Sequence, residues 1–72
     1  MDRLQAISML KELVDNELVD PTYVSMLQVK PNHFQIQIKC GYRKEELEKH
    51  AKKHGLTISE DKDRGYLLVF KP

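Results

Sequence analysis

Two histidines in the second half of the chain have the spacing of metal ligands. His50 and His54 are separated by three residues, so they would lie one turn apart on the same face of a helix. Pairs of imidazoles with this spacing occur in zinc sites, and Cys40 and His33 are the other soft ligands of the chain. No glutamate follows His50, however, and Cys40 and His33 belong to opposite faces of a predicted strand. We therefore predict no metal ligand and no cofactor, and leave open whether the two histidines have any role beyond favourable cations near a helix C-terminus.

Cys40 is the single thiol of the chain and the only candidate nucleophile of that type. Catalysis would require a histidine beside it, which the sequence allows only if the helix carrying His50 and His54 folds back over the end of the preceding strand. A small buried side chain that completes an apolar series explains Cys40 without any chemistry. The three glycines are isolated, so no phosphate-binding loop exists. We expect no catalytic residue, no enzymatic activity and no small-molecule ligand, with a metal- or thiol-dependent protein as a second alternative.

Basic side chains gather between residues 39 and 53, next to a strand with polar side chains on one face. Cations and amides on an open surface can hold phosphates and hydrogen-bond to bases. The net charge of +1 is far from the basic balance of nucleic-acid-binding domains, and glutamates interrupt the stretch. Nucleic-acid binding is therefore an alternative and not the favoured function. The candidate residues for a nucleic-acid or protein partner are His33, Gln35, Gln37, Lys39, Tyr42, Arg43, Lys49, Lys52 and Lys53.

The first helix that positions these residues is predicted from Asp2 onward. Asp2 is a suitable N-cap, and apolar residues recur at steps of three and four along the segment that follows. We expect the helix to end at Asn16 or after Leu18, because Asp20-Pro21 forces a break. The predicted buried stripe consists of Leu4, Ile7, Leu10, Leu13, Val14 and Leu18.

Two strands are predicted after that break. Residues 33–40 alternate strictly, with Phe34, Ile36, Ile38 and Cys40 on the core face. Residues 23–30 are more ambiguous, because β-branched and aromatic residues favour a strand whereas Asp20-Pro21 also suits the start of a helix. We favour the strand, since the Pro31-Asn32 turn would pair it with the strand that follows.

The second half repeats this order with a less apolar helix. Residues 43–54 carry acidic side chains in the first turn and basic ones in the last, and Gly55 suits the position after the helix. Its buried stripe is thin and consists of Leu47, Ala51 and part of His50 or His54. Residues 56–59 and 66–71 are predicted strands, joined by a polar turn.

The last strand is apolar on both faces, because Tyr66, Leu68 and Phe70 alternate with Leu67 and Val69. A strand of this kind is either central in a sheet or in contact with a partner chain. We expect whichever of Leu67 and Val69 faces outward to lie on the face that the helices leave uncovered, and we assign both to self-association.

The sequence therefore predicts a single α+β domain over residues 1–72, with αββαββ order. A four-stranded, mainly antiparallel sheet would carry both helices on one face, in two layers. One cysteine and no long apolar run indicate a cytoplasmic protein without a membrane span. A core this small is often completed by a second chain, so the expected function is a non-catalytic interaction or self-associating module. A homodimer is preferred to a different protein partner.

Overall fold

Two αββ units follow one another in the computed structural model, which describes residues 1–72. The first unit contains helix α1 (Arg3–Asp15), a single 3₁₀ turn η1 (Pro21–Tyr23), and strands β1 (Val24–Lys30) and β2 (His33–Ile38). The second contains helix α2 (Lys44–Lys53) and strands β3 (Thr57–Asp61) and β4 (Tyr66–Phe70). The predicted αββαββ order is confirmed. Neither helix has the length and apolarity needed to cross a membrane.

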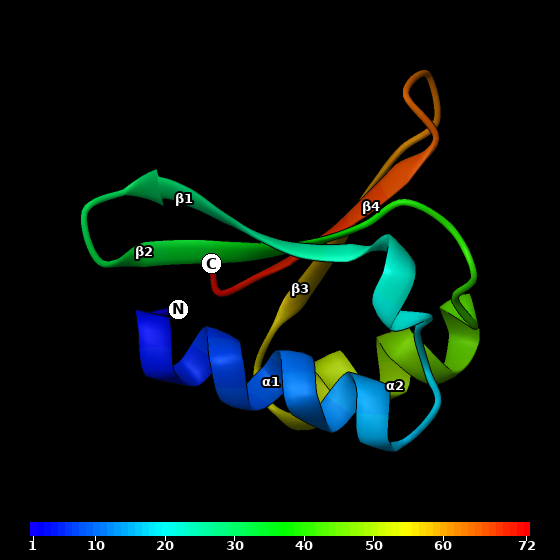
Figure 1. Ribbon diagram of the computed structural model, residues 1–72, viewed down its shortest axis with the longest axis horizontal. Helices are drawn as coiled ribbons and strands as arrows, with labels where there is room; N and C mark the ends of the chain where they lie inside the picture. Colours follow the sequence, from blue (N-terminus) through cyan, green and yellow to red (C-terminus); the bar gives the residue numbers. More distant parts are fainter.

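The four strands form one antiparallel sheet in the order β1-β2-β4-β3. Ile36 of β2 stands opposite Met26 of β1 on one side and Val69 of β4 on the other. Both helices lie on the same face of this sheet, so the predicted two-layer architecture is confirmed (Figure 1). Strands β2 and β4 are therefore central, whereas β1 and β3 each have one free edge.

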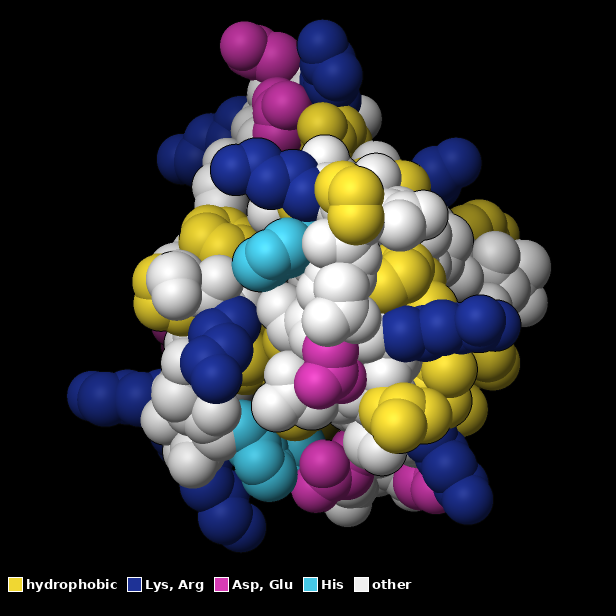
Figure 2. All heavy atoms as spheres, turned by 90° about the vertical axis from the view of Figure 1, so that its left-hand side faces the viewer, with side chains coloured by type: hydrophobic (Ala, Val, Ile, Leu, Met, Phe, Trp, Pro, Cys, Tyr) yellow, Lys and Arg dark blue, Asp and Glu magenta, His cyan; other side chains and the backbone are white.

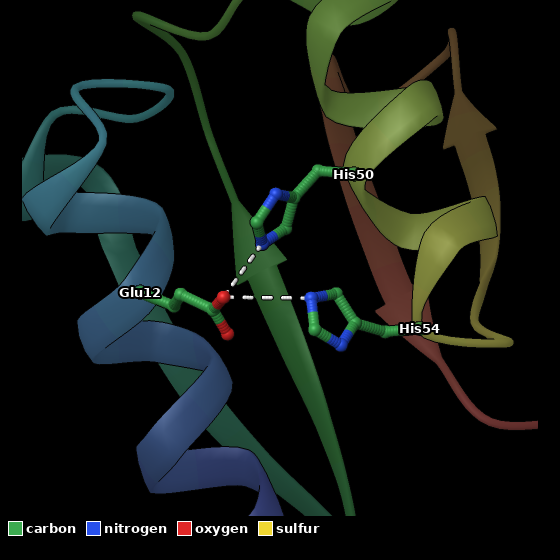
Figure 3. Close-up of side chains that lie close together, drawn as sticks. All are labelled: Glu12, His50 and His54. Carbon is green, nitrogen blue, oxygen red and sulfur yellow. Dashed lines mark ion pairs between the residues drawn. The ribbon is translucent and has the colours of Figure 1, made fainter.

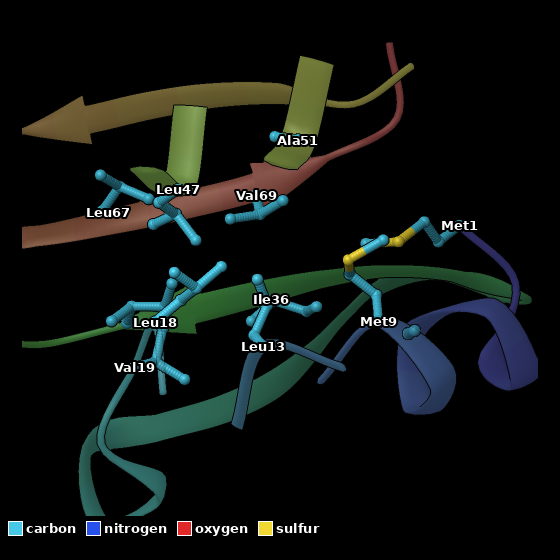
Figure 4. Close-up of a cluster of buried hydrophobic side chains, with 12 residues drawn as sticks. Met1, Met9, Leu13, Leu18, Val19, Ile36, Leu47, Ala51, Leu67 and Val69 are labelled. Carbon is cyan, nitrogen blue, oxygen red and sulfur yellow. The ribbon is translucent and has the colours of Figure 1, made fainter. Parts of the chain in front are cut away.

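The hydrophobic core lies between the inner face of the sheet and the two helices (Figure 4). Leu67 and Val69 point into it, and their exposed fractions are 0% and 1%. The prediction that one of them faces outward and that they mediate self-association is therefore wrong. Their phase follows from the register, because Val69 pairs with Ile36 and Leu67 with Ile38, which already face the helices. The core residues are Met1, Ala6, Met9, Leu13, Leu18, Val19, Ile36, Ile38, Leu47, Ala51, Leu67 and Val69.

Helix α1 turns to the sheet a stripe that overlaps only in part with the predicted one, since Leu13 is buried as predicted. Its buried residues are Ala6, Met9 and Leu13, whereas Leu4 is 76% exposed and Ile7 42% exposed. Apolar side chains extend over more than half of the circumference of this helix, and the single sheet beneath it covers only part of that arc. The prediction that Leu4 and Ile7 are buried is therefore wrong, and both are available to a partner.

The ends of the elements follow local capping. Asp2 accepts a hydrogen bond from the Gln5 N–H at 2.7 Å, and the Gln5 side chain accepts one from the Asp2 N–H at 3.1 Å, which makes a capping box. Asn16 is the C-cap, which is the earlier of the two predicted ends of this helix. Helix α2 is one residue shorter at each end than predicted, since Arg43 and His54 are its caps. Gly55 has φ +70° just beyond it, the conformation that favours glycine.

The ambiguous segment before the first hairpin contains both predicted structures. The Asp20 side chain accepts a hydrogen bond from the Thr22 N–H at 2.9 Å and caps the single turn η1, and the chain then extends into β1. The strand assignment is thus confirmed from Val24 onward. Cys40 differs from its prediction, because β2 ends at Ile38 and the thiol is exposed and free. The strand does not last long enough to carry Cys40 into the core.

Candidate functional site

The polar residues proposed for partner binding on β2 lie on the uncovered face of the sheet. Gln35 and Gln37 are half-buried there, and the Ser25 hydroxyl of β1 donates a hydrogen bond to the Gln37 side chain at 3.5 Å. His33, the first residue of the strand, and Lys39, which follows its last residue, are exposed. The neighbouring positions of β4 are Tyr66, Leu68 and Phe70. This face is therefore a mixed polar and apolar surface without a concentration of charge.

The basic residues of the second helix lie on the other side of the molecule. Lys49 and Lys53 line a shallow depression beside His50, on the helical layer. Arg43 is 3.5 Å from Glu46, and Lys44 is 3.4 Å from Glu60. Tyr42 is also engaged, because its hydroxyl donates to Glu60 at 3.4 Å, whereas Lys52 is exposed.

The two sets of candidates do not combine into one surface, because the sheet separates Gln35 and Gln37 from the lysines of α2. Figure 2 shows one side of the molecule, where basic side chains are scattered among acidic and apolar ones. On this side of the molecule there is no continuous basic surface of the kind that phosphate contacts require.

The free edge of β1 exposes backbone groups whose direction can be derived from the hydrogen bonds of Phe34. The Phe34 N–H donates to the Met1 carbonyl at 2.7 Å, and the Met1 ammonium donates to the Phe34 carbonyl at 3.4 Å. Phe34 thus directs its backbone polar groups away from β1, so its partner Gln28 directs its own toward the free edge. Because this direction alternates along a strand, the free edge carries the N–H and C=O groups of Val24, Met26 and Gln28.

The two edges of the sheet differ in protection. Strand β1 has one charged residue, Lys30, and one irregularity between Gln28 and Lys30. Strand β3 has Glu60 and Asp61 in five residues, and Lys44 reaches over to Glu60. Charged side chains and bulges are the devices that prevent edge-to-edge pairing. Residues 24–28 therefore form a regular, uncharged edge, whereas the β3 edge is guarded.

Helix α1 adds exposed apolar surface beside that edge. Ile7, Leu10 and Val14 follow one another at steps of three and four, so they form one line along the helix. Ile7 is exposed, and Leu10 and Val14 are partly buried against the core. This line lies on the flank of α1 opposite to Glu12, which faces α2. The β1 edge and this flank together are called the β1 surface below.

Between the helices, Glu12 of α1 meets His50 and His54 of α2 (Figure 3). The Glu12 Oε1 atom lies 3.6 Å from His50 Nε2 and 3.4 Å from His54 Nε2. The two rings are 4.8 Å apart at their centroids and inclined by 48°. Both rings direct a nitrogen toward the same carboxylate (Figure 3). We call these three residues the Glu12 cluster.

Burial and access differ within the Glu12 cluster. The His50 side chain is 15% exposed, and its Nε2 atom is buried without a hydrogen-bond partner. His54 is 34% exposed and, with Glu12, lines a groove of about 360 Å³. The histidine pair was visible in the sequence, but its third member was not, because Glu12 reaches it only through the packing of two helices that lie far apart in the chain. Cys40 and His33, the other ligands considered, are not part of the cluster.

Comparison of the chain with models of known protein families, with curated proteins and with solved structures found no match.

Proposed function

We propose that this protein is a non-catalytic, self-associating module that forms a homodimer through the β1 surface. The observation that carries the proposal is the contrast between the two sheet edges: β1 offers unpaired backbone groups without charge, whereas β3 is guarded by acidic residues. Pairing of edge strands satisfies backbone donors and acceptors that otherwise face water. The dimer would join two four-stranded sheets into one continuous sheet.

A second copy of the chain suits this edge because the outward-facing backbone groups, on Val24, Met26 and Gln28, are spaced symmetrically about Met26. In an antiparallel pairing of two β1 strands around a two-fold axis at Met26, Val24 of one chain stands opposite Gln28 of the other. Each of these pairs exchanges an N–H and a C=O in both directions. Leu27 stands opposite Ser25 of the partner on the outer face, so no like charges meet within residues 24–28.

The flank of α1 would support the same dimer. Ile7 is 42% exposed, on the side of the helix that lies toward the β1 edge. Full burial of an isoleucine contributes about 1.5–3 kcal/mol, and covering the exposed part of Ile7 would contribute a corresponding fraction. A two-fold axis through β1 brings the two α1 helices to adjacent positions below the joined sheet. Apolar residues that the monomer leaves exposed would then complete a second, smaller contact.

We place the protein in the cytoplasm, as the sequence predicts. The support is Cys40, which is exposed and unpaired. An exposed thiol persists in a reducing compartment and is prone to oxidation outside it.

Sedimentation equilibrium of a charge variant tests the proposed function. Leu27→Lys places two like charges in the interface, one from each chain. We expect the dissociation constant of the dimer to rise at least about tenfold, equivalent to about 1.4 kcal/mol. Ser59→Lys is the matched control, because it adds the same charge on the same face at the opposite edge strand. Equal weakening by both variants, or a wild-type monomer at high micromolar concentration, would refute the proposal.

A further inference from the structure

We propose that the Glu12 cluster binds one Zn²⁺ ion through Glu12 Oε1, His50 Nε2 and His54 Nε2. This inference is independent of self-association, because the cluster lies between α1 and α2 and the β1 surface lies on the opposite flank of α1. The three donor atoms all lie within 4.8 Å of one another.

The donor set matches the chemistry of zinc. Two imidazole nitrogens and one carboxylate oxygen bind Zn²⁺ in many proteins that leave a fourth position for water. Hard cations such as Mg²⁺ require mostly oxygen ligands, and the cluster supplies only one. The set therefore favours a transition-metal ion of the zinc type.

Two of the three donor separations are close to those of tetrahedral coordination. Metal–ligand bonds of about 2.0–2.1 Å at tetrahedral angles separate neighbouring donors by about 3.3–3.4 Å. Glu12 Oε1 lies 3.4 Å from His54 Nε2 and 3.6 Å from His50 Nε2. Octahedral coordination at the same bond lengths would require about 2.8–3.0 Å between neighbouring donors, so these two separations fit the tetrahedral arrangement better. The third separation, between the two histidines, is within 4.8 Å, so the rings must move closer together when they bind an ion.

An ordinary ion pair accounts for the cluster less well than a metal does. Neither histidine makes a hydrogen bond with Glu12, although both rings direct a nitrogen at it. His50 Nε2 is buried and unpartnered, a state that costs about 1–3 kcal/mol. A bound ion would satisfy this nitrogen and the carboxylate together.

The scaffold holds the ligands in place and leaves one side accessible. Leu13 and Ala51, the sequence neighbours of Glu12 and His50, are 1% and 3% exposed, so both helices are anchored at the cluster. Glu12 and His54 also line the groove of about 360 Å³. The fourth coordination position would therefore be available to water or to an exchangeable ligand.

Isothermal titration with Zn²⁺ tests the site, with tag-free Cys40→Ser protein so that the exposed thiol contributes no binding. We expect one ion per chain and no binding of Mg²⁺. At a zinc concentration of a hundred times the dissociation constant, the thermal midpoint should rise by about 10 °C or more. The absence of both the heat and the shift would overturn the proposal.

Variants of two of the three ligands locate the ion. Glu12→Gln and His54→Ala should each weaken zinc binding at least about 100-fold, the upper range seen when supporting groups around a metal are lost. His33→Ala removes the remaining histidine, which is exposed on β2, and should leave binding unchanged. Thermal midpoints in EDTA establish that each variant is folded. His54 is suited to substitution because it lies at the end of the helix. Retention of full affinity in His54→Ala, or its loss in His33→Ala, would overturn the assignment.

Discussion

Glu12 and Ile7 lie on opposite flanks of helix α1, because five positions along a helix correspond to a rotation of about 140° about its axis. Glu12 faces His50 and His54 of the second helix, whereas Ile7 is exposed beside the edge strand β1. The sheet-facing residues Ala6, Met9 and Leu13 lie between these two flanks. One helix thus carries the core, the Glu12 cluster and part of the β1 surface at three separate positions around its circumference.

This separation predicts that the two proposed properties respond to different substitutions. Ile7→Glu should weaken self-association at least about tenfold, because it places a carboxylate in an apolar contact. Leu4→Glu is the matched control, since Leu4 is even more exposed on the same helix but borders the groove on the other flank. Sedimentation equilibrium measures self-association, and zinc titration measures metal binding by the Glu12 cluster. Equal effects of the two variants on association would contradict the placement of the dimer contact.

A proline substitution probes the backbone of the β1 edge. The Gln28 N–H points to the free edge, so Gln28→Pro removes a donor that the monomer does not use within its sheet. We expect weaker self-association with little change in the unfolding midpoint at low protein concentration. Gln28→Ala keeps the N–H and should associate like the wild type, so similar behaviour of these two variants would count against backbone pairing.

Leu67 provides a test of the corrected core. It is completely buried against the helical layer, and truncation of a buried leucine costs about 2–5 kcal/mol. Leu67→Ala should therefore lower the free energy of unfolding by that amount in denaturant titrations. The same change at Leu4, which is 76% exposed, should cost less than about 0.5 kcal/mol. A small effect at Leu67 would place it outside the core.

The sequence predicted the element types well, but it left three relationships undetermined. Strict alternation located β2, and capping residues located α1, because both signals are local. Leu67 and Val69 could not be placed, since a strand that is apolar on both faces carries no phase of its own. Glu12 was missed because its contact with His50 depends on helix packing. The unpaired edge of β1 depends on strand order, which no local pattern specifies.

Two glycines with positive φ predict different costs of substitution. Gly55 has φ +70° and open space around an added Cβ, so Gly55→Ala should cost only the backbone term of about 1–2 kcal/mol. Gly41 has the same φ, but a Cβ there would lie 3.1 Å from the Asp20 Cβ. Gly41→Ala should therefore cost more than Gly55→Ala in equilibrium unfolding, and the reverse order would show that the Gly41 turn can relax.

Amide hydrogen exchange, measured residue by residue at two protein concentrations, tests the proposed dimer most directly. The N–H groups of Val24, Met26 and Gln28 face the free edge of β1 in the monomer and become hydrogen-bonded only when a second chain pairs with it. We predict fast exchange at these three positions in dilute protein and protection at high concentration. On the guarded β3 edge, Ile58 and Glu60 should exchange fast at both concentrations. Unprotected amides on β1 in a protein that sediments as a dimer would contradict pairing through this edge.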